Sequence, residues 1–263
     1  MRIGYRTPGL RELDFGGKLE LARELELTAI EVHLREFDHE SPEQVRALAD
    51  EMGVTITAVS GGMDLCVPAN FDEALRTAEE NLELCNRLGV DVLFTRSMWP
   101  EPGVPQADTW AHLIPAMRQM TMMAADAGVR LGVETDHGCF IDTLERTERL
   151  MDAVDHDNLY YNYDPTNFYL GGSDPLEVLE RHHQCIVNGH IKDGVYQRNR
   201  REETVIGEGE VPYREIFARL DQLGLDIAMN IEHCSTAECV ASGARFVHGV
   251  LDDLGIARSI REC

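Results

Sequence analysis

The sequence predicts a single (β/α)8 barrel, and three observations support this fold class. Short β-rich runs alternate with longer helical stretches over 263 residues, which is the length of one such barrel. A helix–glycine–strand pattern recurs in the segments MGVTITAV, LGVDVLF, AGVRLGVE and LGLDIAMNIE. No linker or low-complexity segment interrupts this pattern, so we expect one domain over residues 1–263.

Eight short β-rich runs are expected to form the strands. Helices between them would connect the strands as parallel neighbours, and eight such units in a chain of this length favour a closed barrel over an open sheet. The expected strands are Ile3–Arg6, Ala29–Leu34, Thr55–Ser60, Asp91–Thr95, Arg130–Glu134, Leu159–Tyr163, Ile186–His190 and Ile227–Glu232.

Longer helical stretches separate these strands. Ser41 is the expected N-cap of the second helix, and Gly53, Gly89 and Gly128 each follow an expected helix end. Pro115 lies inside an expected helix, which it would kink or restart. The expected helices are Phe15–Leu25, Pro42–Met52, Phe71–Leu88, Asp108–Ala127, Thr143–Val154, Pro175–His183, Pro212–Leu223 and Ala237–Leu254.

Composition argues against two classes of partner. A net charge of −23 repels the phosphate backbone, so we expect no nucleic-acid partner. The chain has no run of 18 or more apolar residues, so we expect no membrane partner. Its first residues, MRIGYRTPGLREL, lack the apolar region of a signal peptide, and we expect a cytoplasmic protein.

The seven cysteines are odd in number, irregularly spaced and without a CxxC pair. This pattern indicates neither a disulfide framework nor a zinc finger. We expect most of them to be reduced residues of the core or of helix faces.

Polar residues at the strand ends identify a candidate site, because the chemistry of such barrels lies at the carboxyl ends of the strands. Four successive strands end at Glu134, Asp164, His190 and Glu232. Three carboxylates and one imidazole suit a divalent ion, with Mn²⁺ as the first expectation and Mg²⁺, Co²⁺ or Zn²⁺ as alternatives. Any one of these residues alone is readily explained as a hydrogen-bonded strand end. Four at equivalent places favour a metal site, because burying several carboxylates without a cation is costly.

The segments VETDHG, YNYDPTN, NGHIKDG and MNIEHC resemble the sugar isomerase/epimerase superfamily with the xylose isomerase-like barrel. The segment GEGEVPYREIF resembles the Gly-x-Gly segment that follows the His-x-Lys-Asp motif in that superfamily. The resemblance is strongest between Arg130 and Glu232. It is specific for the superfamily and does not name a substrate.

The resemblance implies a role for each matching residue. Glu134, Asp164, His190 and Glu232 would hold one divalent ion, and Glu134 and Glu232 would also act as acid and base on opposite faces of a keto-sugar or polyol ketone. The ion would bind two adjacent substrate oxygens and stabilise the enediolate that forms when a carbon-bound proton leaves. Barrels of this superfamily often associate through their outer helices, which implies a homo-oligomer.

Lys192 is the first of six candidate substrate-binding residues. It faces the same side as His190 and is expected to act on a substrate oxyanion, with a salt bridge to Asp193 or to a neighbouring carboxylate as the alternative. Three arginines just after that strand, Arg198, Arg200 and Arg201, are either a phosphate-binding loop or a solvated loop. The remaining candidates are His33, Arg96, Trp99, His137 and Asn167.

Each of these remaining candidates has a structural alternative. His33 would face either the pocket or an interlayer position, and His137 would contact either substrate or a metal ligand. Arg96 and Trp99 would wall the pocket or pack on a rim loop, and Asn167 would bind Asp164 or substrate. His233 has the opposite strand parity to Glu232 and is expected to point into the helix layer.

Two other enzyme classes and one non-catalytic class compete with the metal-dependent isomerase or epimerase. A lyase, of the inosose dehydratase or carbon-glycoside deglycosidase kind, would use the same metal and base, and the sequence does not separate the two. A non-catalytic sugar-binding or assembly subunit is disfavoured by the complete set of four ligands. A DNA-repair endonuclease of the same barrel superfamily is disfavoured by Asn167, which stands where that class needs a histidine, and by the net charge.

Overall fold

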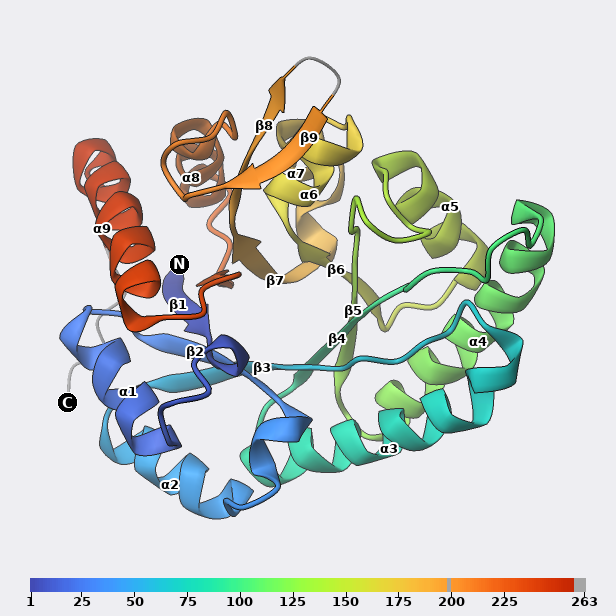
Figure 1. The fold of residues 1–263 in the computed structure, drawn as a ribbon, viewed down its shortest axis with the longest axis horizontal. Helices are drawn as coiled ribbons and strands as arrows, with labels where there is room; N and C mark the ends of the chain where they lie inside the picture. Colours follow the sequence, from blue (N-terminus) through green and yellow to red (C-terminus); the bar gives the residue numbers. More distant parts are fainter. Residues whose placement is uncertain (198–199, 258–263) are drawn as a thin grey trace.

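A computed structural model, which describes residues 1–197 and 200–257, confirms the predicted barrel (Figure 1). Within these residues, eight parallel strands close into a ring in the order β1-β10-β7-β6-β5-β4-β3-β2. Closure pairs every barrel strand on both sides. The strands are β1 (Arg2–Arg6), β2 (Ala29–His33), β3 (Thr55–Ser60), β4 (Val92–Arg96), β5 (Arg130–Glu134), β6 (Leu159–Tyr163), β7 (Ile186–Ile191) and β10 (Ala228–Ile231).

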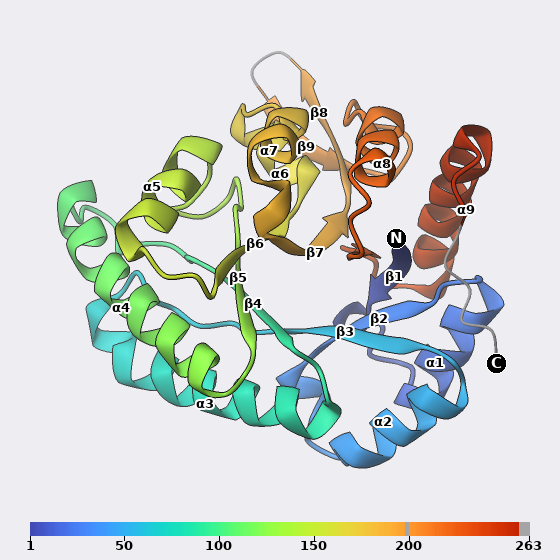
Figure 2. The same ribbon diagram turned by 180° about the vertical axis from the view of Figure 1, so that it is seen from behind.

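Helices surround the ring on its outer side, as Figures 1 and 2 show from opposite directions. The predicted helix ends agree with the structure to within two residues. The helices are α1 (Phe15–Glu24), α2 (Pro42–Glu51), α3 (Phe71–Leu88), α4 (Gln106–Asp126), α5 (Leu144–Val154), α7 (Pro175–His182), α8 (Tyr213–Gln222) and α9 (Ala237–Leu254). No helix within the described residues combines the length and apolarity that a membrane span requires.

The helix ends follow the predicted chemistry, with two differences. Gly53, Gly89 and Gly128 have φ values of 70°, 70° and 71°, the left-handed conformation that glycine adopts without a steric cost. Ser41 stands at the N-cap of α2, but its hydroxyl donates to the Glu43 carboxylate instead of accepting a backbone N–H. The helix α4 runs through Pro115 as one element, so the expected restart there is wrong.

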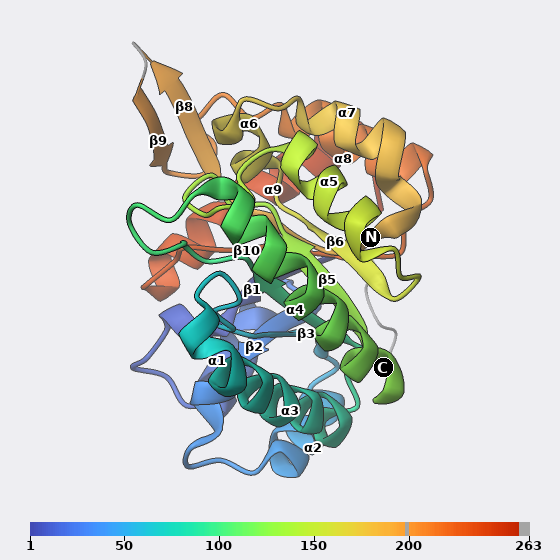
Figure 3. The ribbon, with the colours of Figure 1, turned by 90° about the vertical axis from the view of Figure 1, so that its right-hand side faces the viewer.

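Two elements follow the barrel strands without having been predicted. The short helix α6 (Pro165–Gly171) begins directly after β6, with Asp164 as its N-cap. An antiparallel hairpin of β8 (Asp193–Gln197) and β9 (Arg200–Thr204) follows β7. Figure 3 shows this hairpin extending from the barrel at the end away from the N-terminus.

The cysteines are not all reduced. A disulfide joins Cys234 to Cys239, with 5.3 Å between their Cα atoms, because the turn after β10 brings the start of α9 back toward the strand end. The expectation of reduced thiols holds for Cys66, Cys85, Cys139 and Cys185. Cys263 lies outside the described residues.

Two layers make up the interior. Apolar side chains fill the space between the ring and the helices, as Leu19, Leu113, Phe217 and Val247 illustrate with 0% exposure. Polar side chains gather inside the ring toward its carboxyl end, where Glu31, Asn162, Asn188, His190 and Asn230 are buried. The fold therefore places a charged, enclosed cluster at the end of the strands.

Candidate metal centre

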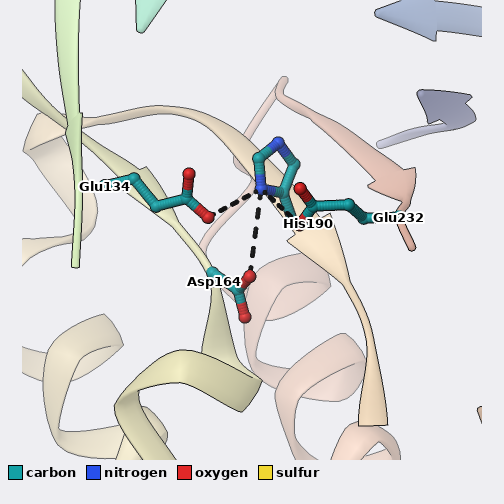
Figure 4. Close-up of side chains that lie close together, drawn as sticks. All are labelled: Glu134, Asp164, His190 and Glu232. Carbon is teal, nitrogen blue, oxygen red and sulfur yellow. Dashed lines mark hydrogen bonds and ion pairs between the residues drawn. The ribbon is translucent and has the colours of Figure 1, made fainter. Parts of the chain in front are cut away.

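The four predicted ligands meet inside the mouth of the barrel. Glu134 is the last residue of β5, Asp164 and Glu232 directly follow β6 and β10, and His190 lies in β7. One ligand atom of each lies within 4.8 Å of those of the other three, and all four residues are buried. Figure 4 shows the three carboxylates directed at one ring nitrogen of His190.

The Nδ1 atom of His190 lies at the centre of this group. It is 3.1 Å from Glu134 Oε1, 3.2 Å from Glu232 Oε2 and 3.9 Å from Asp164 Oδ2. The opposite ring atom, Nε2, is 3.0 Å from Glu31 Oε2. When the proton of the neutral ring is on Nε2 and is donated to Glu31, the unprotonated Nδ1 faces the three carboxylates. Metal-binding histidines commonly have this arrangement, in which the second ring nitrogen donates to a carboxylate.

Glu31 and Arg6 belong to the site, although neither was among the residues we predicted for it. Strand register places them side by side, since Arg6 in β1 pairs with Glu31 in β2. The Arg6 guanidinium forms ion pairs with Glu31 and with Glu232, and the Glu31 side chain is fully buried. The sequence offered only a partial signal, because both residues lie in predicted strands but their pairing depends on strand register.

Three asparagines, one each from β6, β7 and β10, support the cluster through hydrogen bonds. Asn188 donates to Glu31 Oε2 at 2.9 Å and to Asn162 Oδ1 at 2.7 Å, and Asn230 donates to Asn188 Oδ1 at 3.1 Å. The Asn162 amide lies 3.3 Å from His190 Nδ1. These hydrogen bonds fix the rotamers of Glu31 and His190, which a preorganised site requires.

The charge of the cluster fits a divalent cation. Among the described residues it contains four carboxylates, those of Glu31, Glu134, Asp164 and Glu232, and two cations, those of Arg6 and Lys192. Four negative and two positive charges leave two negative charges in a buried volume, which is costly. A divalent ion on neutral His190 would bring this sum to zero, so the residues fit the implied metal.

Burial and neighbouring charges shift the pKa values of the two predicted acid/base residues in opposite directions. Burial raises the pKa of Glu134, and the nearby Glu232 and Asp164 carboxylates raise it further. Burial also opposes ionisation of Glu232, but the charges of His190, Arg6 and Lys192 outweigh it and hold the Glu232 pKa well below its usual range. In His190 burial disfavours the charged form, yet the surrounding carboxylates raise its pKa well above the ordinary value.

Lys192 points to the same side as His190, as predicted. Its Nζ atom is 3.0 Å from Asp164 Oδ2 and 3.6 Å from Glu232 Oε2 and donates to Asn167 Oδ1 at 3.1 Å. The predicted alternative of a neighbouring carboxylate partner is therefore observed, and a pair with Asp193 is not. Burial opposes the charge of Lys192, but Asp164 and Glu232 raise its pKa well above the ordinary value.

Asn167 connects the ligands to Lys192 and His137. Its amide nitrogen donates to Glu134 Oε1 at 3.2 Å and to Asp164 Oδ2 at 3.0 Å. Its Oδ1 atom is 2.9 Å from His137 Nδ1. His137 thus acts on the ligands through Asn167, and both predicted residues lie at the centre.

Asp193, the first residue of β8, holds the loop that follows β9, because its carboxylate accepts backbone N–H groups. The donors are Gly194 at 2.9 Å, Gly207 at 2.9 Å and Gly209 at 3.0 Å. A Cβ atom on Gly209 would stand 1.9 Å from Asp193 Oδ1, so this close approach requires glycine. The predicted Gly-x-Gly segment therefore encloses a carboxylate of the chain itself.

The rim contains the remaining candidates. Arg96 pairs with Asp136 at 3.0 Å, and Trp99 is 61% exposed. His33 lies at the end of β2 and accepts the Arg35 backbone N–H at Nδ1. Burial lowers the pKa of His33 to about 4.

At the rim, the prediction for His233 is wrong, and part of the predicted arginine cluster lies outside the described residues. His233 does not enter the helix layer, because its φ of 60° breaks the strand alternation, and it pairs with Glu203 of β9 instead. Glu203 also lies 3.4 Å from Lys192 Nζ. Arg201 is exposed, with its guanidinium over the Tyr196 ring. Arg198 and the side chain of Arg200 lie outside what the structure describes.

Comparison with known proteins gives one family and several similar enzymes. Residues 19–249 match the family model described as xylose isomerase-like TIM barrel. The chain is 23% identical over 231 residues to the inosose dehydratase of Geobacillus kaustophilus, covering 77% of this chain and 75% of that protein. The inosose dehydratase of Geobacillus thermodenitrificans is 28% identical over 134 residues, or 45% of each chain.

Two solved structures share the fold along most of the chain. The probable 3-DHS dehydratase AsbF of Bacillus anthracis has a TM-score of 0.81 and 20% identity, with 94% of this chain and 99% of that chain covered. The D-psicose 3-epimerase with D-tagatose from Clostridium cellulolyticum H10 has a TM-score of 0.77 and 18% identity, with both chains fully covered. At this level of identity the two structures establish the fold alone.

Proposed function

Since the chain belongs to the xylose isomerase-like TIM barrel family, we propose that it is a divalent-metal-dependent enzyme that removes a carbon-bound proton next to the carbonyl of a polyol ketone. One observation carries this proposal. Two glutamates, Glu134 and Glu232, reach the same buried point from non-adjacent strands, together with Asp164 and His190. Such a set can hold a cation and still place a carboxylate beside a substrate carbon.

When bound, a divalent ion there would polarise the ketone carbonyl as a Lewis acid. The residues of the chain then divide the remaining work. Glu232 is held by the Arg6 guanidinium, whereas among the described residues the Glu134 carboxylate is contacted by the Asn167 amide and by His190. We therefore assign proton abstraction to Glu134, because a carboxylate without a guanidinium partner keeps more of its basicity.

Return of the proton to another carbon or another face would make the protein an isomerase or epimerase. The geometry supports this outcome, because Glu134 and Glu232 approach the Nδ1 atom of His190 from separate strands at 3.1 Å and 3.2 Å. A substrate bound between them would expose a different face to each carboxylate. The carboxylate that did not take the proton could then deliver one.

Loss of a β-hydroxyl group as water is the second candidate outcome, and the sequence relatives favour it. Both curated relatives described above are inosose dehydratases. Lys192 can assist this reaction, because its buried ammonium can donate a hydrogen bond to the departing hydroxyl while Glu134, protonated by the abstraction, returns that proton to form water. Isomerisation has no departing hydroxyl, so the two outcomes place different demands on Lys192.

Proton NMR in D₂O distinguishes these outcomes. We would incubate the Mg²⁺-loaded protein with inososes, free ketoses, ketose phosphates and 3-keto-glycosides, and follow the carbon-bound protons. The proposal expects metal-dependent loss of one proton signal, with a rearranged product for an isomerase and an unsaturated product for a dehydratase. Glu134→Gln should abolish the exchange, and Glu43→Gln, a change of an exposed glutamate paired with Arg87, should leave it intact. Exchange that persists in Glu134→Gln would refute the assignment of the base.

A further inference from the structure

A cavity of about 420 Å³ lies between the segments that follow β2 and β3 and the helix α3. It is lined by the short helix η2 (Leu34–Phe37) and its flanks, by the loop after β3, and by the first half of α3. Polar residues dominate its wall, which contains His33, Arg35, Asn70, Thr77, Asn81 and the four carboxylates of Asp38, Asp64, Glu73 and Glu80. Its volume lies within the range of about 300–1,000 Å³ that is usual for small-molecule sites.

Asn81 provides an independent indication that this cavity takes a ligand. The residue lies on α3 and is 1% exposed. Its amide nitrogen donates to Thr77 O at 2.7 Å, but no donor of the described chain reaches its Oδ1 atom. A buried acceptor without a donor is destabilising, and a ligand hydroxyl would supply that donor.

His33 connects the cavity to the metal centre. Its Nδ1 atom accepts the Arg35 backbone N–H at 3.1 Å, so in the neutral ring the proton is on Nε2. Nε2 lies at the Gly62 wall of the cavity, 4.0 Å from the position of a Cβ on that glycine. Glu31, which contacts His190, precedes His33 by two residues on β2 and has the same parity, so these two residues are about 7 Å apart along the strand.

The cavity offers both donors and acceptors to a ligand. Asp64 accepts from the Cys66 backbone N–H and from the Asn70 amide, which orients Asn70 so that its Oδ1 can accept. His33 and Arg35 donate, Asn81 accepts, and Thr77 can do both. Leu34 and Ala74 add small apolar areas to the wall. This mixture suits a ring with several hydroxyl groups and small apolar C–H faces.

We propose that this cavity is a second sugar-ring subsite, so that the substrate is a polyol ketone linked to a further sugar ring, a keto-glycoside. The ketone would lie at the metal centre, and the linked ring would lie between η2 and α3. Asn81 Oδ1 would accept a hydrogen bond from one hydroxyl of the linked ring. This substrate class rests on the proposed function. Binding of the linked ring alone does not rest on that function, so the experiments can refute the subsite and the proposed function separately.

Saturation-transfer NMR on the metal-free protein tests the subsite without any turnover. The probe is methyl α-D-glucopyranoside, with cyclohexanol as the ring that lacks the hydroxyl pattern. We expect transfer to the glucoside alone, reduced about five-fold in Asn81→Leu, the effect of one lost hydrogen bond. Asn86→Leu is the matched control, because Asn86 is exposed on the same helix.

Two further variants and two possible results complete the test of the subsite. Asn81→Asp keeps an acceptor oxygen and should retain binding, which separates loss of the contact from loss of the fold. Glu134→Gln should also retain it, because the glucoside does not need the metal centre. Transfer that is lost in Glu134→Gln but unchanged in Asn81→Leu would place the ring at the metal centre and overturn the proposal. Absence of transfer in the wild-type protein would mean that the cavity holds only water, which also overturns it.

Discussion

Replacing Arg6 by methionine tests the buried charge balance that we assign to the barrel mouth. The change removes the one guanidinium that pairs with both Glu31 and Glu232, whose side chains are 0% and 5% exposed. Methionine keeps a long apolar side chain, so the loss of charge dominates over the loss of volume. Arg2→Met is the matched control, because Arg2 forms an ion pair with Asp226 that is largely exposed.

The two changes should differ strongly in the metal-free protein. Breaking a buried ion pair by removing one partner costs about 3–5 kcal/mol, and we expect the lower end because the Arg6 side chain is 20% exposed. An exposed pair contributes only about 0–1 kcal/mol. Arg6→Met also removes one positive charge from the buried cluster and leaves it more negative, so added Mn²⁺ should stabilise the variant more than the wild-type protein.

Urea denaturation followed by circular dichroism, with and without Mn²⁺, measures both effects. We expect Arg6→Met to lower the free energy of unfolding by about 3 kcal/mol without metal and to recover part of it with metal. Equal losses in Arg6→Met and Arg2→Met would refute the buried charge balance. A smaller effect of Mn²⁺ on Arg6→Met than on the wild-type protein would refute it independently.

Three further predictions concern other parts of the site. The raised pKa of His190 means that Mn²⁺ must displace a proton, so its affinity should rise with pH until the pH passes the folded-state pKa of His190, with release of about one proton, and calorimetry showing a flat affinity would contradict this. The same raised pKa stabilises the metal-free fold at low pH, and that contribution is lost as the pH rises through the folded-state value. Gly209→Ala, which forces a Cβ against Asp193, should lower the free energy of unfolding by about 1–3 kcal/mol, whereas Gly249→Ala, which meets no neighbouring atom, should not. Lys192→Met should reduce turnover of the ketone by about 100-fold, and unchanged turnover and affinity would exclude its role toward substrate.

The clustering of the four candidate metal ligands was predictable, because their positions depend only on where strands end. Parallel strands of a barrel bring their carboxyl ends together whatever the details of register, so Glu134, Asp164, His190 and Glu232 had to be neighbours. Arg6 and Glu31 were not assigned to the site, because their roles depend on which side chains face one another across β1 and β2. That pairing is set by register, which the sequence pattern alone does not specify.

Departures from regular strand geometry explain the other differences. His233 was assigned by alternation, and its left-handed backbone ends the alternation one residue after Glu232. The strand β9 is formed by the charged segment RREET, which lacks the apolar alternation that marks a strand. The Cys234–Cys239 pair depends on a turn between a strand and a helix, and no spacing motif signals it. The single domain, the homo-oligomer and the cytoplasmic location stay predictions.

The metal centre itself can be tested by one diffraction experiment. Crystals grown with Mn²⁺ would be measured on both sides of the manganese absorption edge, and an anomalous difference map would locate the ion. We expect one strong peak per chain, surrounded by Glu134, Asp164, His190 and Glu232, with Glu31 on the far side of the histidine ring. A map without a peak among these four residues, or with its only peak elsewhere on the chain, would contradict the assignment of this cluster as a metal centre.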